Sequence, residues 1–219
     1  MLFRSPELRA RLLPDHPWGC KRPLLSSNYY TAFNRPNLEL VTEEIEHVSQ
    51  DAIVTVDGKS RPIDTLIIAT GFSATQYLSA IDVTGRDGQL LDDAWSDGAR
   101  AHLGITTSGF PNLFMLYGPN TNNGSILTMI ESQVEYALQQ VQRIAKDDLA
   151  WIDVKSEPME RYNEEIQHAI EDVEVWQASC NGYYRSPSGR VVTQWPYSMS
   201  EFQRRTARPK ADDFEVAPR

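Results

Sequence analysis

The sequence predicts an α/β fold, and three patterns lead to this prediction. Two short apolar runs, residues 64–70 and 113–117, end in small or turn-forming residues, which is typical of buried central strands of a parallel sheet. A polar turn that contains glycine follows the second run at residues 118–124. From Ser125 onwards, apolar side chains recur with a period of 3.6 residues, which indicates an amphipathic helix.

The first predicted elements are short. Residues 1–18 are polar and rich in proline, so we expect an irregular lead-in. Leu38–Val41 and Ile53–Val56 are predicted as short strands, and Val56-Asp57-Gly58-Lys59 is a hairpin-type turn signal. Asp64–Thr70 is the first predicted buried strand. The small residues at its end let the backbone pass close to another segment or to a cofactor.

Residues 85–108 are rich in glycine and aspartate and are expected to be mostly loop. The helix near Ser125 carries an apolar stripe at Leu127, Ile130, Val134, Leu138, Val141 and Ile144. A second helix is predicted after Ser156, with Pro158 in its first turn. Its apolar stripe consists of Met159, Tyr162, Ile166, Ile170 and Val173. The tail is aromatic, and its end is basic through Arg204, Arg205, Arg208 and Lys210.

Composition excludes several functions. A net charge of −9 argues against nucleic-acid binding, which needs a basic surface. No run of 18 apolar residues occurs, so no membrane span is expected, and residues 1–17 lack the apolar stretch of a signal peptide. Cys20 and Cys180 are too few for a disulfide framework, and four scattered histidines do not predict a metal site. A soluble cytoplasmic protein is the default expectation.

The turn at residues 118–124 stands directly before the helix that begins near Ser125. The first N–H groups of a helix have no partner within it, so this end favours an anion or a partial negative charge. The same geometry without a ligand is common. The turn residues therefore have a plainer interpretation as turn and N-cap residues, which stays open beside the functional one.

Three motifs, in this order, resemble one protein family. They are Gly19-Cys20-Lys21-Arg22-Pro23, Asp64-Thr65-Leu66-Ile67-Ile68-Ala69-Thr70-Gly71-Phe72 and Gly109-Phe110-Pro111-Asn112-Leu113-Phe114-Met115-Leu116-Tyr117-Gly118-Pro119-Asn120. Together they resemble the C-terminal part of class B flavoprotein monooxygenases, the Baeyer–Villiger and flavin-containing monooxygenase family, over nearly the whole chain. The resemblance implies a partial flavoprotein with two dinucleotide-binding domains of the FAD/NAD(P)-binding, Rossmann-like type. Residues 1–70 then correspond to the end of the NADPH domain, and residues 71–219 to the returning half of the FAD domain.

The resemblance also implies cofactors and a reaction. FAD, NADPH and O₂ would oxygenate a ketone or a soft nitrogen or sulfur atom. The family's lysine meets the NADPH 2′-phosphate, which assigns this contact to Lys21. The next residue lies beside flavin and nicotinamide, which makes Arg22 the catalytic candidate, because a permanent cation stabilises the negative charge that develops after oxygen adds to reduced flavin. The other implied cofactor contacts are Gly71, Phe72, Gly118, Pro119, Asn120, Thr121, Asn123 and Ser125.

Plainer interpretations stand beside these assignments. Lys21 and Arg22 are also interpreted as two solvated cations in a polar loop, and Gly71 as a simple turn residue. The aromatic residues of the tail are interpreted first as packing residues: Trp176, Tyr183, Tyr184, Trp195 and Tyr197. The stretch around residues 183–196 also resembles the family's C-terminal element, which lies near the substrate.

Two expected family features are absent from the sequence. No two of the 12 glycines lie two positions apart, so neither Gly-x-Gly-x-x-Gly fingerprint for a dinucleotide occurs. The Baeyer–Villiger signature Phe-x-Gly-x-x-x-His-x-x-x-Trp-Pro is absent too. We therefore expect the back part of a longer enzyme, inactive in isolation. The alternative is a non-catalytic fragment or split-enzyme subunit that needs a complementary N-terminal chain. Ketone and heteroatom substrates both stay open.

Overall fold

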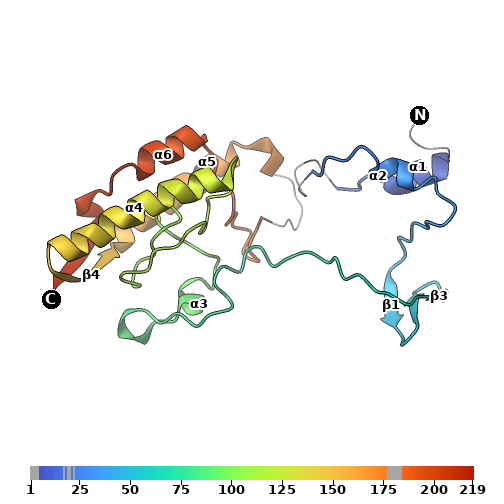
Figure 1. The fold of residues 1–219 in the computed structure, drawn as a ribbon, viewed down its shortest axis with the longest axis horizontal. Coiled ribbons are helices and arrows are strands. Elements are labelled where there is room, and N and C mark those ends of the chain that lie inside the picture. Colours follow the sequence, from blue (N-terminus) through green and yellow to red (C-terminus); the bar gives the residue numbers. More distant parts are fainter. Residues whose placement is uncertain (1–4, 17, 19–20, 22, 177–183) are drawn as a thin grey trace. The chain divides into compact units, whose positions relative to one another are not determined.

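The computed structural model describes residues 5–16, 18, 21, 23–176 and 184–219. The chain divides into two compact units (Figure 1). Unit 1 comprises Met1–Pro17 and Arg22–Phe72, and unit 2 comprises Trp18–Lys21 and Ser73–Arg219. No helix of the described residues combines the length and the apolar character that crossing a membrane requires.

Unit 1 contains two short helices and a small antiparallel sheet. Its elements are α1 (Pro6–Leu12), α2 (Tyr29–Ala32), β1 (Ile45–Val48), β2 (Ala52–Thr55) and β3 (Ser60–Pro62), and the strand order is β1-β2-β3. The expected strand at Ile53–Val56 is confirmed by β2. The expected turn is confirmed as well, since Gly58 there has a φ of 78° that favours glycine.

Two expectations for unit 1 are wrong. Residues 6–12 form a helix because Ser5 caps it: the Ser5 hydroxyl accepts a hydrogen bond from the Leu8 N–H at 3.1 Å, and Pro6 fits the first turn. Leu38–Val41 forms no strand.

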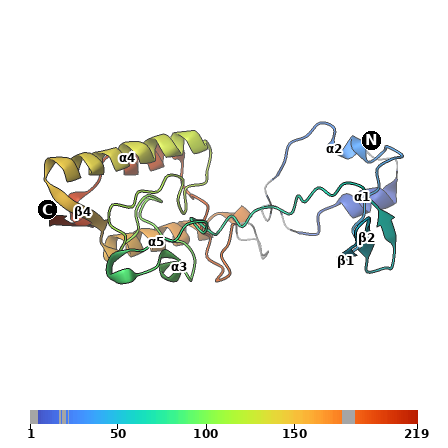
Figure 2. The same ribbon diagram turned by 60° about the horizontal axis from the view of Figure 1, so that its bottom comes forward.

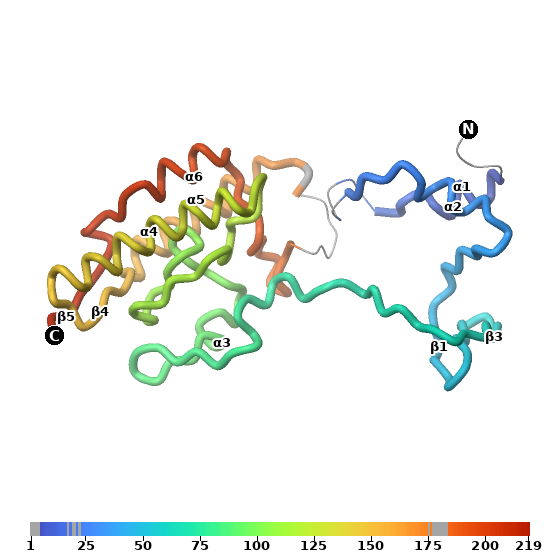
Figure 3. Tube along the Cα trace, viewed as in Figure 1, coloured from blue at the N-terminus to red at the C-terminus, as the bar shows by residue number. Residues whose placement is uncertain are grey.

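The predicted buried strand at Asp64–Thr70 is also not formed. The chain after β3 runs extended without a strand partner among the described residues (Figure 3). Ile67 and Ile68 are 83% and 77% exposed, and Phe72 is 87% exposed. An apolar run becomes a buried strand only where neighbours supply backbone partners and apolar cover, and the described part of unit 1 supplies neither.

Unit 2 is built around helices. They are α3 (Leu91–Ala94), α4 (Ile126–Lys146), α5 (Ser156–Glu171) and α6 (Met199–Thr206), with 3-10 turns at Arg86–Gly88, Glu174–Trp176 and Ala211–Asp213. The two long helices confirm the predictions from periodicity. Ser125 is the N-cap of α4, and Pro158 lies in the first turn of α5. The expectation of mostly loop for residues 85–108 is confirmed apart from the short α3 and the first 3-10 turn.

The second sheet is small and antiparallel, pairing β4 (Leu149–Val154) with β5 (Phe214–Pro218). No parallel sheet is formed by the residues that the structure describes. The predicted strand at Leu113–Tyr117 is irregular, although Met115 in it is buried. The α/β class therefore holds, but the two expected central strands do not appear as strands.

The main core of unit 2 lies where α4, α5 and α6 meet the irregular segment that contains Leu103 and Ile105, which runs between α4 and α5 (Figure 2). Trp195 is fully buried in it and contacts the Phe202 ring edge-on at 5.2 Å. The expected packing role of the tail aromatics is confirmed for the described ones, since Trp176, Tyr184 and Tyr197 also pack on this core. Tyr183 lies outside the described residues.

Candidate functional site

The candidate site is the turn between residues 117 and 125, which connects the irregular apolar segment to α4. The segment is fixed by backbone contacts on its way into the turn. The Met115 N–H donates to the Ile105 carbonyl at 2.7 Å, and the Tyr117 N–H donates to the Gln133 side chain on α4 at 2.7 Å. Tyr117 has a φ of 60°, a backbone conformation that is uncommon for a bulky residue. The Gln133 contact therefore holds the turn in a conformation that Tyr117 would not adopt by itself.

Gly118 is needed because two backbones approach closely at this point. A Cβ atom on Gly118 would lie 2.3 Å from the Gly104 carbonyl oxygen, which is impossible without movement of the backbone. Gly104 has the same constraint, since its Cβ would lie 2.2 Å from the Thr121 side chain. The sequence predicted Gly118 as a cofactor contact, and the structure gives it a packing reason as well.

The polar side chains of the turn are directed into the protein. The buried Asn120 amide donates to the carbonyls of Val191 and Gln194 at 2.8 and 2.9 Å. The Thr121 hydroxyl donates to the Gly118 carbonyl at 2.7 Å. These donors are thus engaged by main-chain oxygens, which is the satisfied state expected of buried polar groups.

The neighbouring Asn122 and Asn123 bind the same distant segment. The Asn122 amide donates to the Gln194 side chain at 2.7 Å, and the Asn123 amide donates to the Trp195 and Tyr197 carbonyls at 3.1 and 3.0 Å. Three asparagines therefore fasten the turn to residues 191–197, which lie some seventy positions later in the sequence. The side chains fix the shape of the turn, and its outer surface is formed by residues 123–127, which are exposed.

The N-terminus of α4 is the polar feature that this outer surface presents. The Ser125 hydroxyl accepts from the Thr128 N–H at 3.4 Å, and the Ser125 N–H contacts the Met199 sulfur at 3.0 Å. Of the first-turn N–H groups, those of Ile126 and Leu127 have no partner within the helix. Because α4 is 21 residues long, its aligned peptide dipoles add to a partial positive charge at this end.

The other predicted site residues are placed as follows. Lys21 is exposed, and Arg22, with Gly19 and Cys20 before it, lies outside the described residues. Gly71 has a φ of 94° and open space where a Cβ would stand, and Phe72 after it is exposed. Pro119 is buried inside the turn. In the described part of the chain, no group of three or more His, Cys, Asp or Glu side chains could hold a metal ion.

Sequence reasoning missed the residues that shape this turn. Gln133 and Gly104 contact the turn but were assigned no role, and the segment 191–197 was assigned packing and substrate-side roles but not its contacts with the turn. Gln133 belongs to the stretch Ile130-Glu131-Ser132-Gln133 in the first turns of the predicted helix. Its position two turns after the N-cap Ser125 was the sequence signal that could have indicated a contact with the preceding turn. The contacts of the segment 191–197 with the turn have no local sequence signal, because most of them are made by backbone carbonyls.

Comparison with known proteins shows what the chain is similar to. No protein-family model matches the sequence. The chain is 41% identical over 218 residues to a Baeyer–Villiger monooxygenase of Pseudomonas aeruginosa. The matched residues make up 98% of this chain and 41% of that protein. The chain matches the C-terminal part of the class B flavoprotein monooxygenases. An FAD-binding monooxygenase of Aspergillus niger is 34% identical over 216 residues, 96% of this chain and 35% of that relative.

Solved structures of these monooxygenases share the fold. The cyclohexanone monooxygenase from Rhodococcus sp. Phi1 bound to NADP⁺ matches with a TM-score of 0.84 and 27% identity, over 100% of this chain and 43% of that one. A steroid monooxygenase bound to NADP matches with a TM-score of 0.87 and 27% identity over the same fractions. The chain thus spans well under half the length of the relatives it matches.

Proposed function

We propose that this chain provides the C-terminal, cofactor-contacting part of an FAD- and NADPH-dependent monooxygenase. The observation that carries the proposal is the turn at residues 117–125, which is fastened from the inside by Gln133 and three asparagines and presents the N-terminus of α4 outward. Such a rigid, pre-oriented set of N–H groups suits a ligand on which negative charge develops, because no reorganisation is needed when the charge appears.

The exposed residues of the site fit a flavin. The outer surface of the turn combines backbone N–H groups with the exposed side chains of Ile126 and Leu127, which suits a flat ring with an apolar body and a polar edge. Gly71, in unit 1, is proposed as a separate contact, since open space lies where a side chain would stand. When bound, FAD reduced by NADPH supplies the oxygen-activating chemistry, and the protein supplies position and charge.

The two cations of the Cys-Lys-Arg motif are proposed to have different roles, one in NADPH binding and one in catalysis. Lys21 would bind the 2′-phosphate of NADPH, for which a flexible point charge is suited. Arg22 would act as a fixed cation beside the reacting centre, since its guanidinium does not lose its proton. An interaction that strengthens only as negative charge develops lowers the barrier without tightening substrate binding. A ketone or a soft nitrogen or sulfur atom is the proposed substrate.

One observation favours a second candidate for the chain in isolation. The apolar stretch from Leu66 to Phe72 is exposed and has no strand partner among the described residues. Exposed apolar stretches of this kind mark surfaces that another polypeptide covers. The second candidate is therefore a fragment or subunit that has no catalytic activity by itself. It would need a second polypeptide chain that supplies the nucleotide-binding glycines.

The experiment joins this chain to the N-terminal part of the Pseudomonas aeruginosa relative and follows ketone and sulfide oxygenation together with NADPH consumption. We expect oxygenated product in the joined protein. Arg22→Ala should leave flavin binding intact but lower product formation by roughly 100-fold, with NADPH oxidation diverted to hydrogen peroxide. Lys21→Ala should weaken NADPH binding by about 1.5–3 kcal/mol, far more than it weakens NADH binding. Unchanged coupling of NADPH use to product in Arg22→Ala would refute the role of Arg22.

A further inference from the structure

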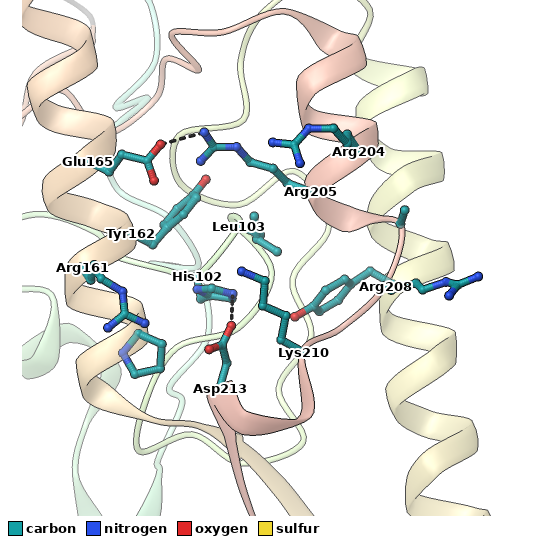
Figure 4. Close-up of a pocket in the computed structure, with 13 residues that line it drawn as sticks. His102, Leu103, Arg161, Tyr162, Glu165, Arg204, Arg205, Arg208, Lys210 and Asp213 are labelled. Carbon is teal, nitrogen blue, oxygen red and sulfur yellow. Dashed lines mark hydrogen bonds and ion pairs between the residues drawn. The ribbon is translucent and has the colours of Figure 1, made fainter.

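A polar cavity lies in unit 2, away from the turn that precedes α4. It has a volume of about 460 Å³, and α5, α6 and the chain between α6 and β5 contribute most of its wall (Figure 4). It shares no lining residue with residues 117–125. Five cationic side chains line it against two carboxylates, in a protein whose net charge is −9.

Part of this positive charge is held in place by neighbouring acids. Arg204 and Arg205 both bind Glu201, at 2.6 and 2.7 Å, and they lower the pKa of Glu201 to about 2. Arg205 also pairs with Glu165 at 2.7 Å and lies over the rings of Trp195 and Tyr197. Arg205 is therefore a structural cation that ties α6 to α5, and its charge reaches the cavity from a fixed position.

Lys210 is different, because its ammonium forms no hydrogen bond or ion pair with any described residue. Its side chain reaches towards His102 in the cavity, while Arg208 extends away from it (Figure 4). The His102 imidazole is 3.8 Å from the Asp213 carboxylate. Burial lowers the pKa of His102 to about 4, with Lys210 acting in the same direction and Asp213 opposing it. At neutral pH, His102 thus adds no charge, and the nearby Asp213 carboxylate is the acidic group that interacts with it.

Tyr162 adds an unpartnered donor to the same cavity. It is 7% exposed, and its buried hydroxyl has no hydrogen-bond partner among the described residues. Burial raises the pKa of the phenol, so it remains protonated and can donate. The hydroxyl is directed towards Arg205 (Figure 4). Buried hydroxyl groups are nearly always paired, so this orphan donor next to the Arg205 guanidinium indicates that an acceptor belongs beside it.

We propose that this cavity binds a small organic phosphate. Its wall includes Arg161 of α5, Arg204 and Arg205 of α6 and Lys210 of the following loop. Cations from three elements suit the several oxygens of a phosphate better than a planar carboxylate. Lys210 supplies a point charge, and Tyr162 supplies a neutral donor. The cavity is larger than a phosphate, and Leu103 and Pro158 in its wall give the organic part an apolar surface.

The test is calorimetric titration of the full chain with glycerol 3-phosphate, inorganic phosphate and acetate at constant ionic strength. We expect saturable binding of glycerol 3-phosphate, weaker binding of inorganic phosphate, and none of acetate. Lys210→Gln and Tyr162→Phe should each weaken the binding of glycerol 3-phosphate by about tenfold, which is the effect of losing one charge-assisted or buried hydrogen bond. Lys146→Gln, which removes the same charge from the exposed end of α4, is the matched control and should change nothing.

Three outcomes would overturn the proposal. They are the lack of saturable glycerol 3-phosphate binding below about 10 mM, binding of inorganic phosphate alone, and an equal loss in Lys146→Gln, which would mean attraction to overall charge. Circular dichroism of each variant checks that it is folded. Tyr162→Phe keeps the packed ring, so it separates loss of the hydroxyl donor from loss of the fold.

Discussion

The two apolar runs that resemble strands behave differently, although the sequence predicts the same structure for both. In the run from Asp64 to Phe72, the side chains of Ile67 and Ile68 are exposed and no strand pairs with it. In the run from Leu113 to Tyr117, Met115 is buried, and the backbone is bound by Ile105 and by Gln133 of α4. The second run has partners within the chain, and the first has none among the described residues.

The difference shows that an apolar sequence makes burial of a segment possible. Whether the segment is buried depends on the neighbouring residues that pack on it. Around residues 113–125 the chain provides its own partners, so a rigid turn forms even without a sheet. Around residues 64–72 the same kind of sequence remains open.

The largest predicted effect is a difference in stability between two variants that each lose one aromatic ring, one in the core of unit 2 and one in the exposed run. Phe202→Ala, in the core of unit 2, should lower the free energy of unfolding by about 3–5 kcal/mol. Phe72→Ala should change it by less than about 0.5 kcal/mol, because an exposed ring loses little on truncation. Urea unfolding followed by tryptophan fluorescence measures both. A loss of similar size in Phe72→Ala would mean that residues 64–72 are packed in solution.

The next effect concerns pH. His102 is buried in unit 2, and its pKa is lowered from an ordinary 6.5 to about 4 by burial. Between these two pKa values, His102 is protonated in the unfolded chain but neutral in the folded chain. The free energy of unfolding should therefore fall as pH drops from about 6.5 to 4, by on the order of 3 kcal/mol.

His102→Gln should flatten the pH dependence of the unfolding free energy across this window. His47→Gln is the matched control, because His47 lies exposed on β1 of unit 1. Urea unfolding at a series of pH values distinguishes the two variants. If both variants keep the full dependence, the titrating group is not His102.

A smaller effect is expected within the turn itself. Asn120→Ala removes two buried hydrogen bonds to the carbonyls of Val191 and Gln194, which should destabilise unit 2 by about 1–3 kcal/mol. Asn123→Ala, whose bonds are near the surface, should cost less. Amide hydrogen exchange at residues 117–128 should rise in Asn120→Ala if the asparagine fixes the turn. Unchanged exchange there would show that Asn120 does not fix the turn.

The sequence predicted the two long helices well because their signals are local. The apolar period and the cap at Ser125 placed α4, and the Val56–Lys59 turn placed the β2–β3 hairpin. The roles of Asn120 and Asn123 could not be predicted, because their partners are main-chain carbonyls far along the sequence. The basic end at Arg204–Lys210 was visible, but the cavity depends on how α6 packs against α5. The two expected strands failed because a strand is defined by its neighbours.

The most direct test of the account is the flavin content of the chain alone and of the chain joined to the N-terminal part of the Pseudomonas aeruginosa relative. Both are purified with added FAD and examined by absorbance. We expect the chain alone to be colourless, because it lacks the pyrophosphate-binding glycines, and the joined protein to carry about one flavin per chain. Gly118→Val in the joined protein should lose flavin, since its side chain would meet the Gly104 carbonyl. Stoichiometric flavin on the chain alone, or a folded but colourless joined protein, would contradict the account.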